Sequence, residues 1–139
     1  MNTEGNGGES VPHARHIPHY HGDSVRGMFV VGAILLIVAQ STGAELPLST
    51  TGAVVGAIVL AVAAGITNPR ATWIHWVNEF ITVWGALLFG TTAVAHYRSG
   101  VGILDPSFIY TEALALISLG ALYFATRTIR GLHQRPPLL

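Results

Sequence analysis

Four polar side chains recur at helical spacing inside a long apolar stretch of the chain. They are His75, Asn78, Glu79 and Thr82, and the spacing i, i+3, i+4, i+7 places them on one face of a helix. A carboxylate and an imidazole one helical turn apart can both titrate, and both can bind a metal ion. The chemistry that this face allows is therefore proton transfer or cation binding within a membrane.

The same face also fits a purely structural role, which we prefer. Glu79 lies about 12 Å inside a helix that begins near residue 71, a depth at which an unpaired charge costs several kcal/mol. We expect it to face away from lipid, with His75 as its nearest partner and Asn78 adding hydrogen bonds. Such groups join one membrane helix to another. Two ligating groups and an amide are too few for a stable metal site, and the first two apolar runs offer no further ligand.

Large aromatic residues occupy the opposite face of this helix. They are Trp73, Trp76, Phe80 and Trp84. Tryptophan is enriched where membrane helices meet the headgroups, so we expect Trp73 and Trp76 as interface anchors and Trp84 deeper, against lipid or another subunit. A pigment, quinone or haem could lie on such a surface, and the cofactor stays unknown. One chain does not supply a haem site, because His75 and His96 are separated by roughly 30 Å along one helix.

The composition indicates lipid as the surroundings of these residues. The chain has 139 residues, of which 50% are apolar and only 10% charged, and its mean hydropathy is +0.51. A soluble domain carries about 25% charged residues. The absence of Cys excludes a disulfide scaffold, a zinc-cysteine site and thiol catalysis. Zero net charge argues against nucleic acid as a partner. The sequence contains neither a nucleophile–base pair nor a phosphate-binding loop, so we do not expect an enzyme.

Four apolar runs predict an all-α integral membrane protein with four transmembrane helices. Within a membrane domain of residues 25–130 the predicted spans are 27–44, 48–67, 71–95 and 107–126. Each should be a continuous helix, because the bilayer core offers no water to backbone groups. A polar, His-rich tail (1–24) precedes the domain and a short tail (131–139) follows it.

Capping residues mark where these helices should begin. Asp23 and Ser24 are suitable N-caps for the first run. Asn68 followed by Pro69, and Asp105 followed by Pro106, match a cap and a first helical residue.

The connections and the arginines predict the topology. Short connections make neighbouring helices antiparallel, which gives two hairpins. Six of the seven arginines fall on the side shared by both termini and the middle loop, and only Arg98 falls on the other. This bias predicts that both termini are cytoplasmic, and we expect the location to be a bacterial plasma membrane.

The two hairpins also resemble each other loosely. Residues 31–36 are similar to 84–89, and residues 42–49 are similar to 99–107. Two explanations stay open, a parallel tandem repeat or convergence on a membrane composition.

A second polar cluster is predicted at the outer end of the bundle. Glu112 lies roughly 7 Å inside the outer boundary of the fourth span. His96, Tyr97 and Arg98 end the third span and can meet it across the short loop. We expect this cluster to be structural.

The second span contains two pairs of small residues that are four positions apart. Gly52 and Gly56, then Ala61 and Gly65, have the spacing that lets helix backbones approach closely. They could serve packing within the bundle or a homodimer contact.

The N-terminal tail holds four of the seven histidines. They are His13, His16, His19 and His21. Weak binding of a transition metal is conceivable, but interleaved Pro and Arg favour a solvated tail without a metal.

These patterns lead to two functional expectations. The first is a small polytopic membrane protein that acts through helix packing, as an accessory subunit or self-associating bundle among other membrane subunits. The alternative is a small proton-coupled or cation transporter that uses His75, Asn78 and Glu79. A transporter needs this face open to a water-accessible cavity, whereas packing needs it sealed between helices.

Overall fold

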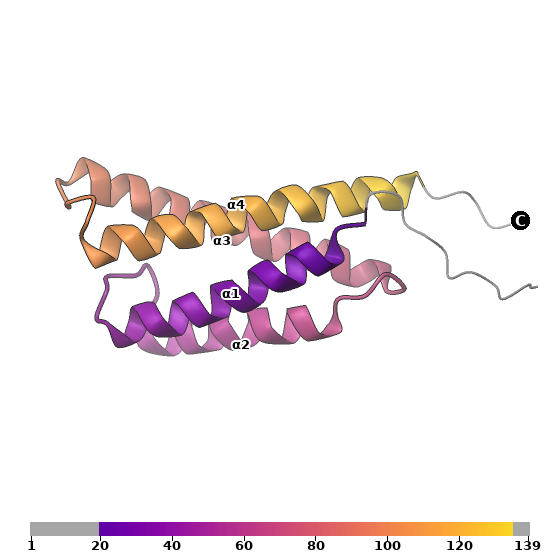
Figure 1. Cartoon of the computed structure of the whole chain (residues 1–139), viewed down its shortest axis with the longest axis horizontal. Helices are drawn as coiled ribbons and strands as arrows, with labels where there is room; N and C mark the ends of the chain where they lie inside the picture. The colour runs from indigo at the N-terminus through magenta and orange to yellow at the C-terminus, as the bar shows by residue number, and fades with distance from the viewer. Residues whose placement is uncertain (1–19, 135–139) are drawn as a thin grey trace, which may run out of the picture.

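The computed structural model describes residues 20–134 and forms a bundle of four antiparallel helices. The helices are α1 (Gly22–Ser41), α2 (Thr50–Ile66), α3 (Thr72–Arg98) and α4 (Pro106–His133). The start of α1, the α2–α3 connection and the end of α4 lie at one end of the bundle, and the other two connections lie at the opposite end (Figure 1). The predicted all-α architecture of four helices is confirmed for this part of the chain.

The helices do not all pair equally. α3 packs along α4 and α1 packs along α2, while α1 also contacts α4 and so joins the two hairpins. α2 and α3 are consecutive in the chain, yet they make only slight contact. The bundle is therefore closed on three sides and loose on the fourth.

The fourth helix begins as its sequence predicts. The Asp105 carboxylate accepts a hydrogen bond of 2.8 Å from the backbone N–H of Ser107, and Pro106 occupies the first helical position. A proline fits there because its missing N–H would have no helical acceptor.

The predicted N-caps of the first and third helices are wrong. α1 already begins at Gly22, so Asp23 lies in its first turn. There its carboxylate interacts favourably with the positive end of the helix dipole. Asn68 does not cap α3: its side-chain oxygen accepts from the backbone N–H groups of Arg70 and Ala71 at 2.9 and 3.0 Å. This turn uses the Asn oxygen locally, and α3 therefore begins only at Thr72.

Three of the helices are long and apolar enough to cross a membrane, namely α1, α3 and α4. α2 is shorter, and its 17 residues extend about 26 Å at 1.5 Å per residue. α1 ends at Ser41, earlier than the predicted run, because Gly43 turns the chain with a φ of 77°. α4 continues to His133, beyond the predicted end of the last span.

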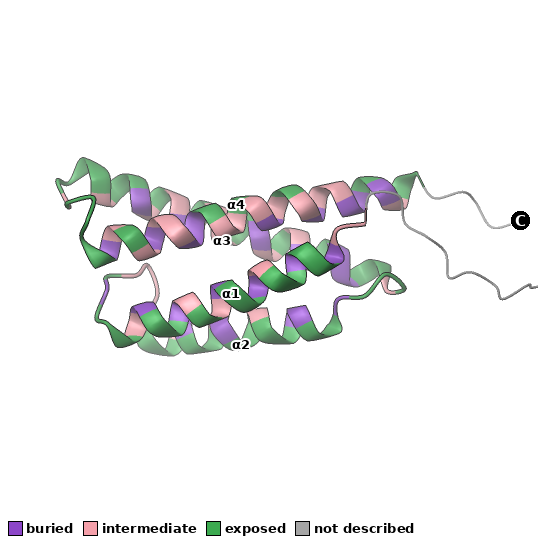
Figure 2. Ribbon diagram, viewed as in Figure 1, coloured by how far each residue is buried: buried purple, intermediate pink, exposed green. Residues whose placement is uncertain are grey.

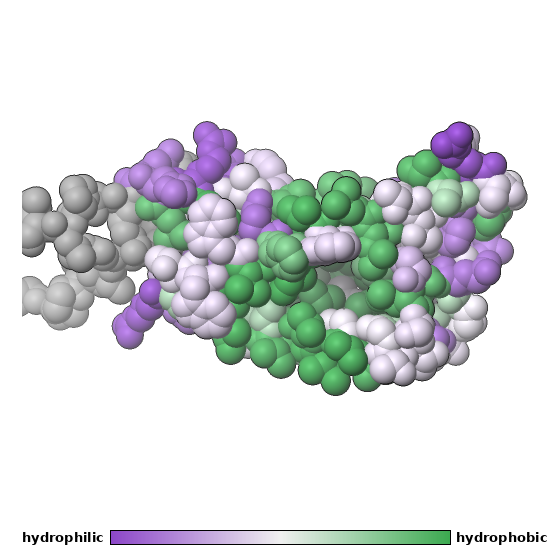
Figure 3. All heavy atoms as spheres, turned by 180° about the vertical axis from the view of Figure 1, so that it is seen from behind, coloured by the Kyte–Doolittle hydropathy of each residue, from purple (hydrophilic) through white to green (hydrophobic). Residues whose placement is uncertain are grey.

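Apolar side chains cover the outside of the bundle, and small ones fill much of the inside. Every buried residue of α2 is alanine, whereas its Val and Ile residues are exposed, so that most of the α2 ribbon is coloured as exposed (Figure 2). Figure 3 shows an apolar band between two more hydrophilic ends. These are the features of an integral membrane protein in contact with a lipid bilayer.

α3 approaches α4 closely at a glycine. A Cβ on Gly85 would lie 2.6 Å from the hydroxyl oxygen of Ser118. A larger residue there would require the Ser118 side chain or α4 to shift, so Gly85 permits close packing of the two helices.

Candidate functional site in the bundle interior

The polar face of α3 lies inside the bundle. The side chains of His75, Asn78 and Thr82 are 2%, 1% and 2% exposed, and Glu79 is half-buried. The aromatic residues of the opposite face, Trp73, Trp76, Phe80 and Trp84, are all exposed on the outer surface. α3 therefore turns its polar face toward the interior and its aromatic face outward, as the helical spacing of these residues predicts.

A buried hydrogen bond joins α3 to the end of α2. The amide nitrogen of Asn78 donates to the hydroxyl of Thr67 at 2.8 Å, and that hydroxyl donates to the carbonyl of Ala63 at 2.6 Å. Both side chains are nearly inaccessible. Thr67 is the residue that ends α2, so this bond closes the tight turn between the two helices.

A second hydrogen bond joins α3 to α4. The hydroxyl of Thr126 donates to the Oε1 atom of Glu79 at 2.7 Å. The sequence predicted His75 as the nearest partner of Glu79. It did not indicate Thr67 or Thr126 as hydrogen-bond partners of the polar face. The available signal was their placement, because Thr67 and Thr126 both end apolar runs at the same side of the membrane as Glu79.

Two acceptor atoms in this cluster have no hydrogen-bond donor among residues 20–134. They are the Oδ1 atom of Asn78 and the Oε2 atom of Glu79, both buried. Buried acceptors without donors are uncommon and cost free energy, so they mark a place where a proton, a cation or a further polar group would be stabilised.

The segment before α1 covers the end of this cluster. The Tyr20 ring packs edge-on against the His75 ring, with centroids 5.6 Å apart, and lies so close to Gly22 that a Cβ there would collide with it. The backbone N–H of His21 donates to the Thr128 hydroxyl at 2.9 Å, and its ring packs on Phe124. Together these contacts close the bundle over His75.

The surroundings of Tyr20 also affect its acidity. Burial raises the pKa of the Tyr20 hydroxyl, the carboxylate of Asp23 raises it further, and the Arg26 guanidinium opposes both in part. The hydroxyl therefore stays neutral at physiological pH.

The His-rich tail lies mostly outside the described residues, which include only His21 of its four predicted candidates. The ring of His21 packs on an aromatic side chain. Within residues 20–134 there is no group of three or more His, Cys, Asp or Glu side chains placed to hold a metal ion.

At the outer end of the bundle, His96 of α3 contacts a threonine of α4. The Nδ1 atom of His96 lies 3.3 Å from the Thr111 hydroxyl, one residue before the half-buried Glu112. Tyr97 and Arg98 are exposed. The Ser107 hydroxyl at the start of α4 accepts from the backbone N–H of Glu45 at 2.8 Å, which ties the α1–α2 connection to α4.

The small residues of α2 divide between two surfaces. Gly52 and Gly56 face the interior, where a Cβ on Gly56 would make ordinary contact with Leu36 at 3.5 Å. Ala61 and Gly65 are exposed, and a Cβ on Gly65 would meet no atom within 4 Å.

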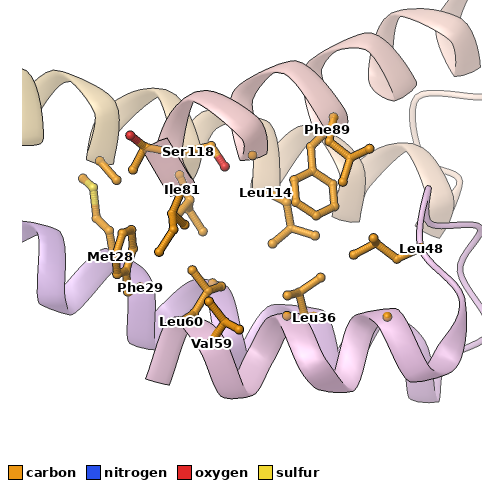
Figure 4. Close-up of a pocket in the computed structure, with 18 residues that line it drawn as sticks. Met28, Phe29, Leu36, Leu48, Val59, Leu60, Ile81, Phe89, Leu114 and Ser118 are labelled. Atoms are coloured by element: carbon orange, nitrogen blue, oxygen red, sulfur yellow. The ribbon is translucent and has the colours of Figure 1, made fainter. Parts of the chain in front are cut away.

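An apolar cavity of about 210 Å³ lies beside the polar cluster, in the middle of the bundle (Figure 4). All four helices line it, and among residues 20–134 its only polar lining residues are Thr82 and Ser118. The hydroxyl of Thr82 donates to the carbonyl of Glu79 in its own helix at 2.8 Å. The cavity is thus an apolar space and not a polar channel to the cluster.

No family model, curated protein or solved structure matches this chain. The geometry of the described residues therefore carries the functional argument.

The Thr67–Asn78 hydrogen bond makes a stability prediction. Thr67→Val removes the acceptor and leaves the buried amide of Asn78 without it, so we expect a loss of about 1–2 kcal/mol in the free energy of unfolding. Thr91→Val is the matched control, because the exposed Thr91 hydroxyl bonds only to carbonyls of its own helix. Unfolding in mild detergent measures both variants, and equal losses would contradict a special role for Thr67.

Proposed function

We propose that this chain acts through helix packing, as an accessory subunit or self-associating bundle in a larger membrane assembly. The observation that carries the proposal is the closure of the polar face of α3. Asn78 and Glu79 form hydrogen bonds to α2 and α4, and Tyr20 covers His75. The adjoining cavity is apolar. Polar groups arranged in this way hold helices together.

A hollow on the outer face of α1 and α2 supports a contact with another membrane helix. Gly27 and Gly65 lie on its wall, together with Ala61 and Ala64. A Cβ on either glycine would meet no atom of this chain within 4 Å. Small outward-facing residues let a second helix backbone approach closely, and van der Waals packing then stabilises the pair in lipid.

The hollow generates a prediction about assembly. Gly65→Leu should leave the bundle folded, because the site is empty in this chain, but should lower the fraction of protein that migrates above the mass of one chain in mild detergent. The lost close contact between helices is the physical reason. Val62→Leu on the same helix is the control, since Val62 is already a large exposed residue.

Native mass determination in mild detergent checks this prediction. It reports whether the 14.7 kDa chain occurs with further copies or with other subunits. A wild type that is always a single chain would contradict the packing proposal, and so would equal assembly of the two variants.

We further propose four membrane crossings with both termini cytoplasmic, in a bacterial plasma membrane. The start of α1, the α2–α3 connection and the end of α4 lie at one end of the bundle (Figure 1). These segments carry Arg26, Arg70, Arg127 and Arg130, whereas Arg98 ends α3, whose end belongs to the other side. Excess arginine favours the cytoplasmic side. The length of α2, about 26 Å, is close to the thickness of the hydrocarbon core, roughly 30 Å. This supports the proposal that α2 crosses the membrane.

Single cysteines test this topology in a chain that has none of its own. An impermeant thiol reagent applied to intact cells should label Glu45→Cys and Gly102→Cys, because both positions are exposed in the outer connections. Thr72→Cys and Gln134→Cys should be labelled only after the membrane is opened. Labelling of Thr72→Cys from outside would mean that α2 does not cross.

A second candidate function, proton-coupled or cation transport, is favoured by one observation. The Oδ1 atom of Asn78 and the Oε2 atom of Glu79 are buried acceptors on consecutive residues without a donor in the described part of the chain. A proton or a cation would satisfy them. Within a membrane, an acidic residue such as Glu79 often marks an ion or proton pathway.

Glu79→Gln separates the two candidates. The amide keeps an acceptor oxygen for Thr126 but cannot exchange a proton, so packing predicts unchanged assembly and stability. Transport predicts a folded variant that has lost pH-dependent flux in proteoliposomes. A wild type with no flux of protons or common cations would exclude the transport role, and wild-type flux that Glu79→Gln abolishes would support it.

A further inference from the structure

The interior cavity has a definite length and direction. On α2 its lining runs from Gly52 to Leu60, and on α3 from Ile81 to Phe89. Eight residues of helix correspond to about 12 Å along the axis. A volume of about 210 Å³ distributed over such a length describes a narrow slot that runs parallel to the helices.

Neither a helix nor ordered water is a suitable occupant. A helix with its side chains is about 10 Å across and does not fit a slot of this volume. Buried water needs roughly two to four polar partners, and the part of the chain that the structure describes supplies only Thr82 and Ser118 as polar residues of the wall. Apolar cavities of about 150 Å³ bind small hydrocarbons such as benzene, so this slot has room for hydrocarbon.

The slot communicates with the side of the bundle that lies toward lipid. α2 and α3 make only slight contact along this edge. Val59 lines the slot and is at the same time 45% exposed on the outer surface. Figure 3 shows this face of the molecule, where apolar side chains surround a hollow.

We propose that the slot between α2 and α3 binds one hydrocarbon chain of a membrane lipid. The slot runs in the same direction as lipid chains beside a membrane-spanning bundle, and its wall is apolar. Its volume has room for roughly seven methylene groups at about 30 Å³ each. Bound hydrocarbon replaces the contacts that α2 and α3 do not make with each other. This binding site is independent of the hollow proposed for assembly, which lies between α1 and α2.

Photolabelling by lipid tests the proposal. The full chain is reconstituted in dioleoyl phosphatidylcholine vesicles doped with a phosphatidylcholine whose acyl chain carries a diazirine near its middle. After irradiation, peptide mass mapping compares two leucines of α4. Leu116 is 59% exposed to the surroundings, whereas Leu114 is 2% exposed and lines the slot (Figure 4). We expect label on both in the wild type.

Filling the slot should remove only the inner label. Gly56→Leu places a side chain beside Leu36 in the slot, so we expect loss of the label at Leu114 with the label at Leu116 retained. Gly90→Leu is the control, because a Cβ there meets no atom within 4 Å and Gly90 is not part of the wall. An unlabelled Leu114 in the wild type overturns the proposal without reference to any variant. Label at Leu114 that persists in folded Gly56→Leu overturns it as well.

Discussion

The bundle depends on a constraint set by lipid, which cannot hydrogen-bond the polar side chains of α3. A carboxylate and an amide within the hydrocarbon region must find partners on other helices. Glu79 finds Thr126 on α4 and Asn78 finds Thr67 at the end of α2. These two bonds orient α3 about its axis, and the same orientation turns its tryptophans outward.

Residue size then decides which helices meet. Gly85 lets α3 approach Ser118 of α4 closely, and the alanines of α2 let α1 pack against it. Small residues bring two backbones together, but they leave no bulk to reach a third helix. Because these side chains are small, they do not fill the space between α2 and α3. The apolar slot beside the polar cluster has the same cause.

Local signals predicted the helices well and their beginnings unevenly. Hydrophobic runs indicated all four helices, and Asp105 caps α4 as expected, because its carboxylate accepts from the free backbone N–H of Ser107. Asn68 has the same capping ability, but its oxygen closes a turn over Arg70 and Ala71 instead. A side chain that can serve two nearby backbone conformations does not by itself select one.

By itself, the sequence determined the environment, the four helices and the two faces of α3, because hydropathy and a period of 3.6 residues are local properties. It did not determine the partners across helices. Thr67, Thr111 and Thr126 are ordinary members of apolar runs until packing brings them to Asn78, His96 and Glu79. The tertiary structure alone also decided which glycines of α2 face the interior and which face outward. The same holds for the slot, because both depend on which helix packs against α2. Contacts between helices arise from the relative placement of whole elements, which no spacing along a single helix encodes.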